Sequence, residues 1–270
     1  MSLRTKINGI RDIWQFSNRW HLIFSRLFFS NETVQYYRLN DIEFISDHAA
    51  GDTNGAREVL TSPMYKRFLS QLALPHDIKV IDLGANNGGF PLLLKSQNLF
   101  IKELLCVELN PHTFARLCFN LDRNFGDRFT AINCAVCGSN RPVLFHPGQS
   151  SVSDNIYHET VKNGLSSRQI GRTFNDIYEE FFGDSIVDIC KLDIEGAEFE
   201  LFRDANASKI SRCKYVIIEI HHSAKTPREL VLKEFRDAGF DEINGEKKIG
   251  DRHYVHLFAS STLLNEDTTL

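Results

Sequence analysis

The segment that most constrains the fold runs from Lys79 to Phe90 and reads KVIDLGANNGGF. A short apolar run contains Asp82 near its end, and a turn with Gly84 and Gly88 then leads into a helical pattern. In a parallel sheet, a loop at the carboxyl end of such a strand is where ligands bind. Glycine lacks a Cβ and adopts positive φ, so the backbone of this loop can approach a ligand closely.

Two kinds of cofactor bind loops of this type. The dinucleotide fingerprint is G-x-G-x-x-G, with the pyrophosphate at the N-terminus of the helix. Here Asn86 stands at the second glycine position, and Asp82 precedes the first glycine by two residues. A carboxylate repels a pyrophosphate but attracts the ammonium and sulfonium of S-adenosylmethionine. The loop therefore favours S-adenosylmethionine, and a nicotinamide-dependent oxidoreductase is the alternative.

The composition excludes some partners and compartments. A formal charge of −4 leaves no overall basic excess to neutralise phosphates, so we expect no nucleic-acid partner. Six cysteines fall mostly within apolar segments, as buried reduced thiols do in cytosolic proteins, and the chain is predicted to be cytoplasmic. Cys134 and Cys137 have C-x-x-C spacing, but a second pair is missing, so no metal site is expected there.

The N-terminus is basic and aromatic. Residues 1–30 carry five basic residues against Asp12 alone, and these are interleaved with tryptophan, phenylalanine and leucine. No apolar run reaches the roughly 20 residues of a membrane-spanning helix. We predict a helical cap packed on the catalytic domain, with peripheral contact to an anionic membrane as the alternative.

The chain divides into two predicted parts. Residues 1–76 are expected to form a mainly helical cap, with an extended segment near 36–46 and a helix over 56–74. Residues 77–270 alternate strand and helix, which predicts an α/β domain with a parallel sheet. Its expected strands are 78–83, 103–109, 129–136, 186–194, 215–221, 242–244 and 253–260, and its expected helices include 89–97, 174–182, 197–205, 227–238 and one capped by Asn110-Pro111.

A long insert interrupts this alternation at residues 137–185. Such an interruption in a compact domain is typical of a lid or binding loop. We expect it to shape the acceptor pocket, with Ser150, Ser151, Asp154 and His158 as candidates for binding sugar hydroxyls.

Candidate site residues follow four of the expected strands. Glu108 ends the second strand, where an acid accepts hydrogen bonds from ribose hydroxyls. Asn133 and Ala135, at the end of the third, are expected beside the adenine by position alone. The catalytic candidates are Asp193 and Glu195 after the fourth strand and His221 at the end of the fifth. At this edge a histidine can act as a general base or, with a carboxylate, as a metal ligand.

Several strings together resemble the FkbM family of S-adenosylmethionine-dependent methyltransferases. They are DLGANNGGF, VELNP, TFNDIYEEFFG, KLDIEGAEFELF and YVIIEIHH, and the likeness covers about 78–222. Asp82, Gly84, Asn86 and Gly88 match the cofactor loop of the family, Glu108 its ribose acid, and Asp193, Glu195 and Glu198 its acids after strand four. Asn87 with the doubled glycine, and Pro91, depart from many relatives.

The resemblance implies a fold and an activity. The implied fold is that of class I methyltransferases, a Rossmann-like, seven-stranded and mostly parallel sheet with an antiparallel last strand. The implied reaction is O-methylation of a hydroxyl on a sugar, glycan or related small molecule. A non-catalytic nucleoside-binding module is a further alternative, although the intact acidic cluster speaks against it.

Overall fold

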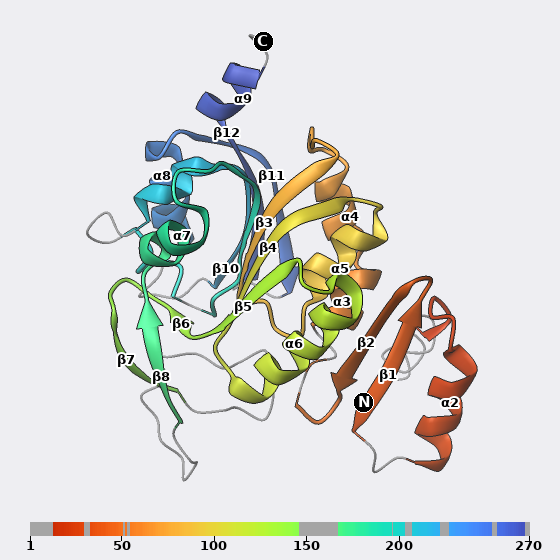
Figure 1. Ribbon diagram of the computed structural model, residues 1–270. Helices are drawn as coiled ribbons and strands as arrows, with labels where there is room; N and C mark the ends of the chain where they lie inside the picture. The colour runs from red at the N-terminus through yellow and green to blue at the C-terminus, as the bar shows by residue number, and fades with distance from the viewer. Residues whose placement is uncertain are drawn as a thin grey trace.

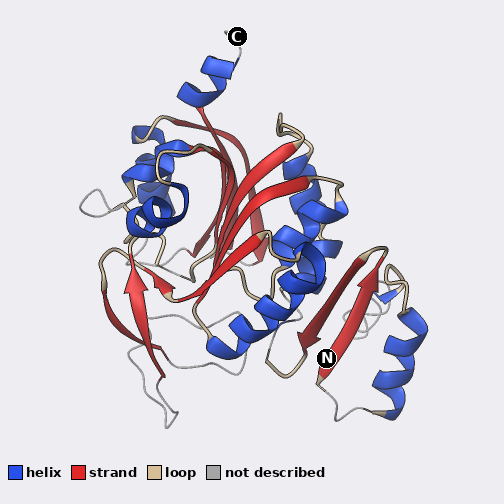
Figure 2. Ribbon diagram, in the orientation of Figure 1, coloured by secondary structure: helices blue, strands red, loops and turns tan. Residues whose placement is uncertain are grey.

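The centre of the molecule is a seven-stranded sheet with helices on both faces (Figures 1 and 2). The structure is a computed structural model that describes residues 13–29, 33–50, 52, 55–145, 167–195, 197–202, 207–221, 227–249 and 253–267. The strand order is β11-β12-β10-β9-β3-β4-β5. The strands are β3 (Asp77–Leu83), β4 (Phe100–Glu108), β5 (Phe129–Asn133), β9 (Val187–Leu192), β10 (Cys213–His221), β11 (Phe240–Ile249) and β12 (His253–Ser260).

Strand directions confirm the predicted fold class. Strands β3, β4, β5, β9 and β10 pair in parallel, whereas β12 is antiparallel to both of its neighbours. The chain starts the sheet at β3, moves outward through β4 to β5, and returns to place β9 on the other side of β3. This reversal makes the carboxyl ends of β3 and β9 a topological switch point, where open α/β sheets bind their ligands.

Alternating apolar residues of the central strands supply two hydrophobic cores. On β3, Ile78 and Val80 belong to one core, and Ile81 and Leu83 belong to the other. The first core is covered by α3 (Ala56–Thr61), α4 (Pro63–Leu69), α5 (Gly89–Ser96) and α6 (Pro111–Phe125). The second is covered by α7 (Phe174–Phe182), the 3-10 helix η3 (Ser208–Arg212) and α8 (Arg228–Asp237), and α9 (Ser261–Asp267) follows β12 at the C-terminal end.

The N-terminal region differs from the expected mainly helical cap because it contains a complete β-hairpin. Strands β1 (Val34–Leu39) and β2 (Ile42–Asp47) pair antiparallel, and the turn between them places Asn40 at a φ of 54°. The helix expected over 56–74 is instead the pair α3 and α4. Proline disfavours a helical conformation in the residue before it, and Ser62, which precedes Pro63, is extended. The division at residues 76 and 77 stays a prediction.

Asparagine side chains attach both edges of this hairpin to helical segments. On α6, Asn120 accepts from the Ile45 amide at 2.8 Å and donates to its carbonyl at 3.0 Å, and Asn124 binds the same two groups of Glu43. Four residues of helix rise about 6 Å and two residues of strand about 6.6 Å, so the i,i+4 pair matches alternate strand residues. On β1, the carbonyl of Tyr36 accepts from Asn18 and the amide of Arg38 donates to it, and Asn18 directly precedes α2 (Arg19–Phe28). The hairpin edges therefore have partners for backbone groups that would otherwise be open to aggregation.

The described residues of the insert at 137–185 contribute two strands to a small sheet. The strand expected over 129–136 breaks at Cys134, and its last part is β6 (Ala135–Val136) in a separate sheet of order β6-β8-β7. The other members are β7 (Arg141–Phe145) and β8 (Ser167–Arg172), and α7 begins at Phe174 as expected. The candidates Ser150, Ser151, Asp154 and His158 lie outside the described residues.

The helix expected over 197–205 is absent from the described residues of that range, which form turns. These turns bury two carboxylates. Glu198 reaches His221, and Glu200 accepts from the Gly138 amide and pairs with Arg141.

Replacing Asn120 by alanine should destabilise the fold by about 3 kcal/mol, because both backbone groups of Ile45 and the carbonyl of Asn87 lose a buried partner. Urea unfolding followed by circular dichroism measures this loss. Gln71→Ala is the matched control, since its amide makes one solvent-exposed hydrogen bond, and its effect should stay within about 0.5 kcal/mol. Equal stabilities of the two variants would refute the proposed attachment.

Candidate functional site

The glycine loop after β3 lies against the end of β9. Gly84 has a φ of 75°, Asn86 of 50° and Gly88 of 92°. A Cβ at Gly84 would lie 1.7 Å from the carbonyl oxygen of Asp193, whose own amide donates to Leu83 at 2.9 Å. No side chain fits there. The loop therefore turns directly over the residue that the sequence predicts to be catalytic.

Glu108 braces this loop from the end of β4. Its carboxylate accepts from the Asn86 amide at 2.9 Å and from the Asn110 amide at 2.8 Å, and the side chain is buried. The position is compatible with the predicted ribose role, which stays a prediction.

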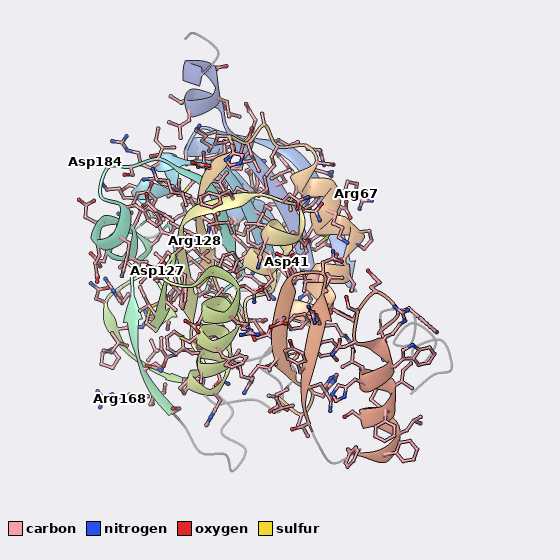
Figure 3. The ribbon with its side chains drawn as sticks, turned by 45° about the vertical axis from the view of Figure 1, so that its right-hand side comes forward. Asp41, Arg67, Asp127, Arg128, Arg168 and Asp184 are labelled. Atoms are coloured by element: carbon pink, nitrogen blue, oxygen red, sulfur yellow. The ribbon has the colours of Figure 1, made fainter. Side chains whose placement is uncertain are left out.

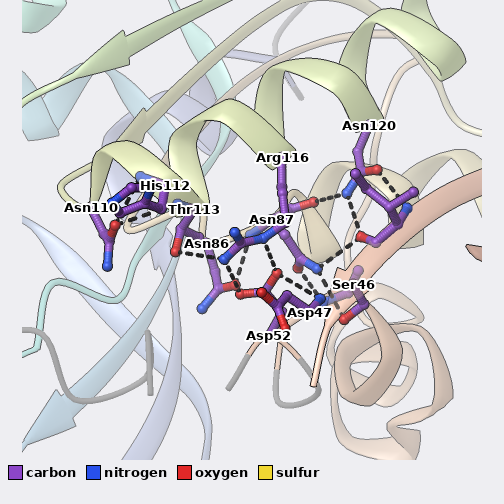
Figure 4. A network of polar contacts seen from close by, with 12 residues as sticks. Ser46, Asp47, Asp52, Asn86, Asn87, Asn110, His112, Thr113, Arg116 and Asn120 are labelled. Carbon is purple, nitrogen blue, oxygen red and sulfur yellow. Dashed lines mark hydrogen bonds and ion pairs between the residues drawn. The ribbon is translucent and has the colours of Figure 1, made fainter. Parts of the chain in front are cut away.

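The two asparagines of the loop face different partners (Figure 4). The side chain of Asn86 accepts from the amide of Asn87 at 2.8 Å. The buried side chain of Asn87 accepts from the Ala56 amide at 2.7 Å and donates toward Ile45 at 3.4 Å. A Cβ at Gly89 would lie 2.9 Å from the Cα of Ala56. Asn87 and the doubled glycine thus accommodate the close approach of α3 and the hairpin.

Asn133 and Ala135 occupy structural positions. The Asn133 amide donates to the carbonyls of Glu108 at 2.7 Å and Leu109 at 2.9 Å, which fixes the backbone after β4. Ala135 is buried with Cys137 and Val143 in the core of the small sheet. Their expected place beside the adenine stays a prediction.

A buried lysine connects the acids at the switch point. Asp82 and Lys191 are register partners on β3 and β9, and the Lys191 ammonium lies 3.3 Å from Asp82, 3.3 Å from the Gly84 carbonyl and 3.4 Å from Asp193. Burial alone would lower the pKa of Lys191, but the two carboxylates outweigh it and raise the pKa well above its usual value. Burial raises the pKa of Asp82, and Lys191 opposes that shift.

The three predicted catalytic residues lie together. His221 Nε2 is 3.3 Å from Glu195, 4.0 Å from Asp193 and 3.8 Å from Glu219, while Nδ1 is 2.8 Å from Glu198. Glu195 itself has a φ of 52°, which is unusual for a residue with a side chain. One imidazole is thus surrounded by four carboxylates.

This arrangement sets the charge of the cluster. Burial opposes protonation of His221, but the hydrogen bond to Glu198 and the nearby carboxylates raise its pKa to about 10. Burial and the charge of Asp193 raise the pKa of Glu195 to about 9. These contacts favour the protonated form of His221 near neutral pH. An imidazolium has no lone pair to accept a proton, which leaves Asp193 as the first candidate for the base.

Sequence reasoning overlooked the roles of two residues here. Lys191 had a usable signal, because a lysine inside a mostly apolar strand is rarely buried without an acidic partner. His253 had none, since it reaches the site only through the antiparallel register that pairs it with His221. Its imidazole lies 3.4 Å from Glu219.

The same side chains meet the geometry of a cation site. Asp193, Glu195 and His221 hold ligand atoms within 4.8 Å of one another, and so do Glu219, His221 and His253. Both sets include His221. Carboxylate and imidazole are ligands for divalent transition metals, so the choice between base and metal ligand that the sequence left open needs a direct test.

The described part of the insert lines a pocket of about 770 Å³ between the small sheet and α7. Its lining includes Asn140, Arg141 and Arg172. This pocket is separate from the acidic cluster. That the insert selects the acceptor stays a prediction.

Comparison with known proteins identifies the family. The model described as "Methyltransferase FkbM domain" matches residues 82–242. A solved FkbM methyltransferase from Methylobacillus flagellatus KT is 18% identical with a TM-score of 0.51, and the alignment covers 70% of this chain and 45% of that protein. The chain thus spans less than half the length of this relative, and the likeness supports the fold. No curated protein matches the chain.

Two further solved structures have lower similarity. Trm5b from Pyrococcus abyssi is 15% identical, with a TM-score of 0.47 and coverage of 85% of this chain and 56% of that one. TrmK from M. capricolum, solved with S-adenosylhomocysteine, is 10% identical, with a TM-score of 0.45 and coverage of 75% and 70%.

The family model covers more than half of the chain and includes the glycine loop, Glu108 and the acidic cluster. It confirms the resemblance and, with it, S-adenosylmethionine as the cofactor. The chain belongs to the FkbM family of methyltransferases.

Proposed function

We propose that this protein transfers the methyl group of S-adenosylmethionine to a hydroxyl of a sugar, glycan or related small molecule. The observation that carries the proposal is the acidic cluster around His221, placed at the switch point beside the glycine loop. Bound there, the cofactor supplies an electrophilic methyl group on a sulfonium. Family membership favours methyl transfer over hydride transfer, so a nicotinamide-dependent oxidoreductase is disfavoured.

The charge of the site suits this cofactor. Even with Glu195 protonated, the four other acids, Asp82, Asp193, Glu198 and Glu219, outnumber the positive charges of Lys191 and His221. The surplus of carboxylates favours a ligand with an ammonium and a sulfonium and disfavours one with a pyrophosphate. On β3, directly before the loop, Asp82 Oδ2 is buried without a hydrogen-bond partner among the described residues.

The protein has three tasks in such a transfer. The loop after β3 and Glu108 hold the nucleoside, and the end of β9 positions the acceptor for in-line attack. An alcohol is a poor acid, so a nearby group must also take or weaken its proton. Asp193 is the first candidate for that role. We expect the insert at 137–185 to choose the acceptor.

Glu108→Ala should weaken binding of S-adenosylhomocysteine by about 1–3 kcal/mol, the scale of charge-assisted hydrogen bonds. Isothermal titration calorimetry measures the affinity. The variant Glu108→Gln removes the negative charge but keeps one acceptor oxygen, so it separates the effects of the two. Glu103→Ala is the matched control on the same strand, because Glu103 is only half-buried and pairs with Lys79. Unchanged affinity in both Glu108 variants would remove the ribose assignment.

Substitutions in the acidic cluster around His221 should lower the rate of methyl transfer. We expect at least one of Asp193→Asn, Glu195→Gln and His221→Ala to lose ~10²–10⁴-fold in turnover, the usual cost of removing a general base, with little change in cofactor affinity. Turnover is followed with labelled cofactor and an acceptor found by screening glycans. Asp184→Asn, an exposed acid just before β9, is the control.

Two outcomes would change this assignment. If all three variants kept full turnover on a verified acceptor, the cluster would have no part in the chemistry. If a chelator abolished activity and Mn²⁺ or Mg²⁺ restored it, the same side chains would act as metal ligands rather than as a base.

A further inference from the structure

The N-terminal segment carries an exposed apolar surface. Six large side chains within 16 residues are between 49% and 70% exposed: Trp14, Trp20, Phe24, Leu27, Phe28 and Phe29. We call this set the aromatic surface. Single exposed apolar residues are ordinary, but contiguous ones mark interaction sites.

The rings of this surface contact one another. Trp14 and Trp20 pack edge to face with centroids 5.4 Å apart, and Phe24 lies 4.6 Å from Phe28 and 5.9 Å from Phe29. In Figure 3, ring-bearing side chains of α2 project away from the hairpin. They therefore form continuous patches rather than isolated groups.

Other apolar side chains of the same segment are buried in the hydrophobic core. Leu22 is buried against the hairpin, and Phe16 packs on Tyr37 and Phe44 with centroids 4.9 and 5.9 Å apart. The segment thus has two apolar sides, one in the core and one exposed. The predicted packing of a helical cap on the domain explains the buried side chains but not the exposed ones.

The charge around the aromatic surface is positive. Residues 13–29 contain Arg19 and Arg26 and no acid, although the whole chain has a formal charge of −4. Arg26 is exposed, and the guanidinium of Arg19 lies 5.3 Å from the ring centre of Trp14. Further along the sequence toward the N-terminus, Arg4, Lys6 and Arg11 outnumber Asp12.

We propose that the aromatic surface binds the face of an anionic phospholipid bilayer. Tryptophan and phenylalanine insert at the boundary between headgroups and acyl chains, and arginines attract anionic headgroups. None of the described helices has both the length and the apolar character to cross a bilayer, so the contact is peripheral. A second copy of the chain fits less well, because a twofold contact through this surface would bring like charges of Arg19 and Arg26 together.

The hairpin connects α2, which carries most of the aromatic surface, to the glycine loop of the site. The residue before α2, Asn18, binds β1, while Asn120 links β2 to the carbonyl of Asn87 in the glycine loop. A bilayer contact at α2 would therefore hold the methyltransferase site near the lipid surface.

Vesicle co-sedimentation tests the proposal with the full chain. Binding to vesicles that contain phosphatidylglycerol should exceed binding to pure phosphatidylcholine at least about tenfold, the scale for two arginines near an anionic surface. Added salt should reduce the difference. The triple variant Phe24→Ser, Leu27→Ser and Phe28→Ser should lose at least about tenfold in affinity for the anionic vesicles.

The control variant removes exposed apolar side chains elsewhere. Leu144→Ser with Ile170→Ser should bind vesicles as the unchanged protein does, since both side chains are exposed on the small sheet. Circular dichroism and S-adenosylhomocysteine affinity establish that each variant is folded.

Three outcomes would overturn the proposal: no binding of the unchanged protein to anionic vesicles, equal binding to both vesicle types, or undiminished binding of the folded triple variant. Concentration-dependent dimerisation lost in the triple variant, without vesicle binding, would also overturn it and assign the surface to a second copy. None of these results bears on methyl transfer, which the cluster variants test separately.

Discussion

The pairing of Lys191 with Asp82 is the interaction on which the site depends. The two residues are register partners on neighbouring parallel strands, and both are buried. A slip of one residue between β3 and β9 would move the ammonium to the opposite face of the sheet, among apolar side chains. Because an unpaired buried charge costs several kcal/mol, the ion pair permits one register. That register also brings the Gly84 loop to Asp193.

The lysine further determines how the two loops face each other. An ammonium has three N–H donors, and three acceptors lie within 3.4 Å: Asp82, the Gly84 carbonyl and Asp193. They come from a strand, the loop after it and the residue after the neighbouring strand. A single side chain therefore couples the cofactor loop to the candidate base, and the remaining acids gather around His221 instead.

The sequence allowed much of this architecture to be predicted because its signals are local. The apolar run before Gly84 indicates β3, Asn110-Pro111 indicates the start of α6, and the ends of the expected strands place Glu108, Asp193 and His221 at one edge. Each signal depends on the preferences of a few neighbouring residues. The same reasoning identified Asp193, Glu195 and His221 as a group, and the structure brings them together.

What could not be predicted depends on contacts distant in sequence. Asn87 and Asn120 look like ordinary polar residues until the hairpin lies beside them, and His253 meets His221 only through strand pairing. The protonation of His221 likewise follows from Glu198, which a turn rather than the expected helix delivers. Tertiary packing, rather than propensity, decided these features.

The tight contact at Gly84 changes what can be inferred from a glycine in such a loop. The absent Cβ makes room for a carbonyl oxygen of the protein's own backbone, not for a ligand. A related protein that had lost catalytic activity would still need Gly84 for the packing of the loop against β9. A glycine at this position therefore indicates the fold and not the activity. Loss of Glu108 or Asp193 would indicate a change in the chemistry. Whether a duplicated copy of the gene still encodes an active protein should be assessed at these two positions.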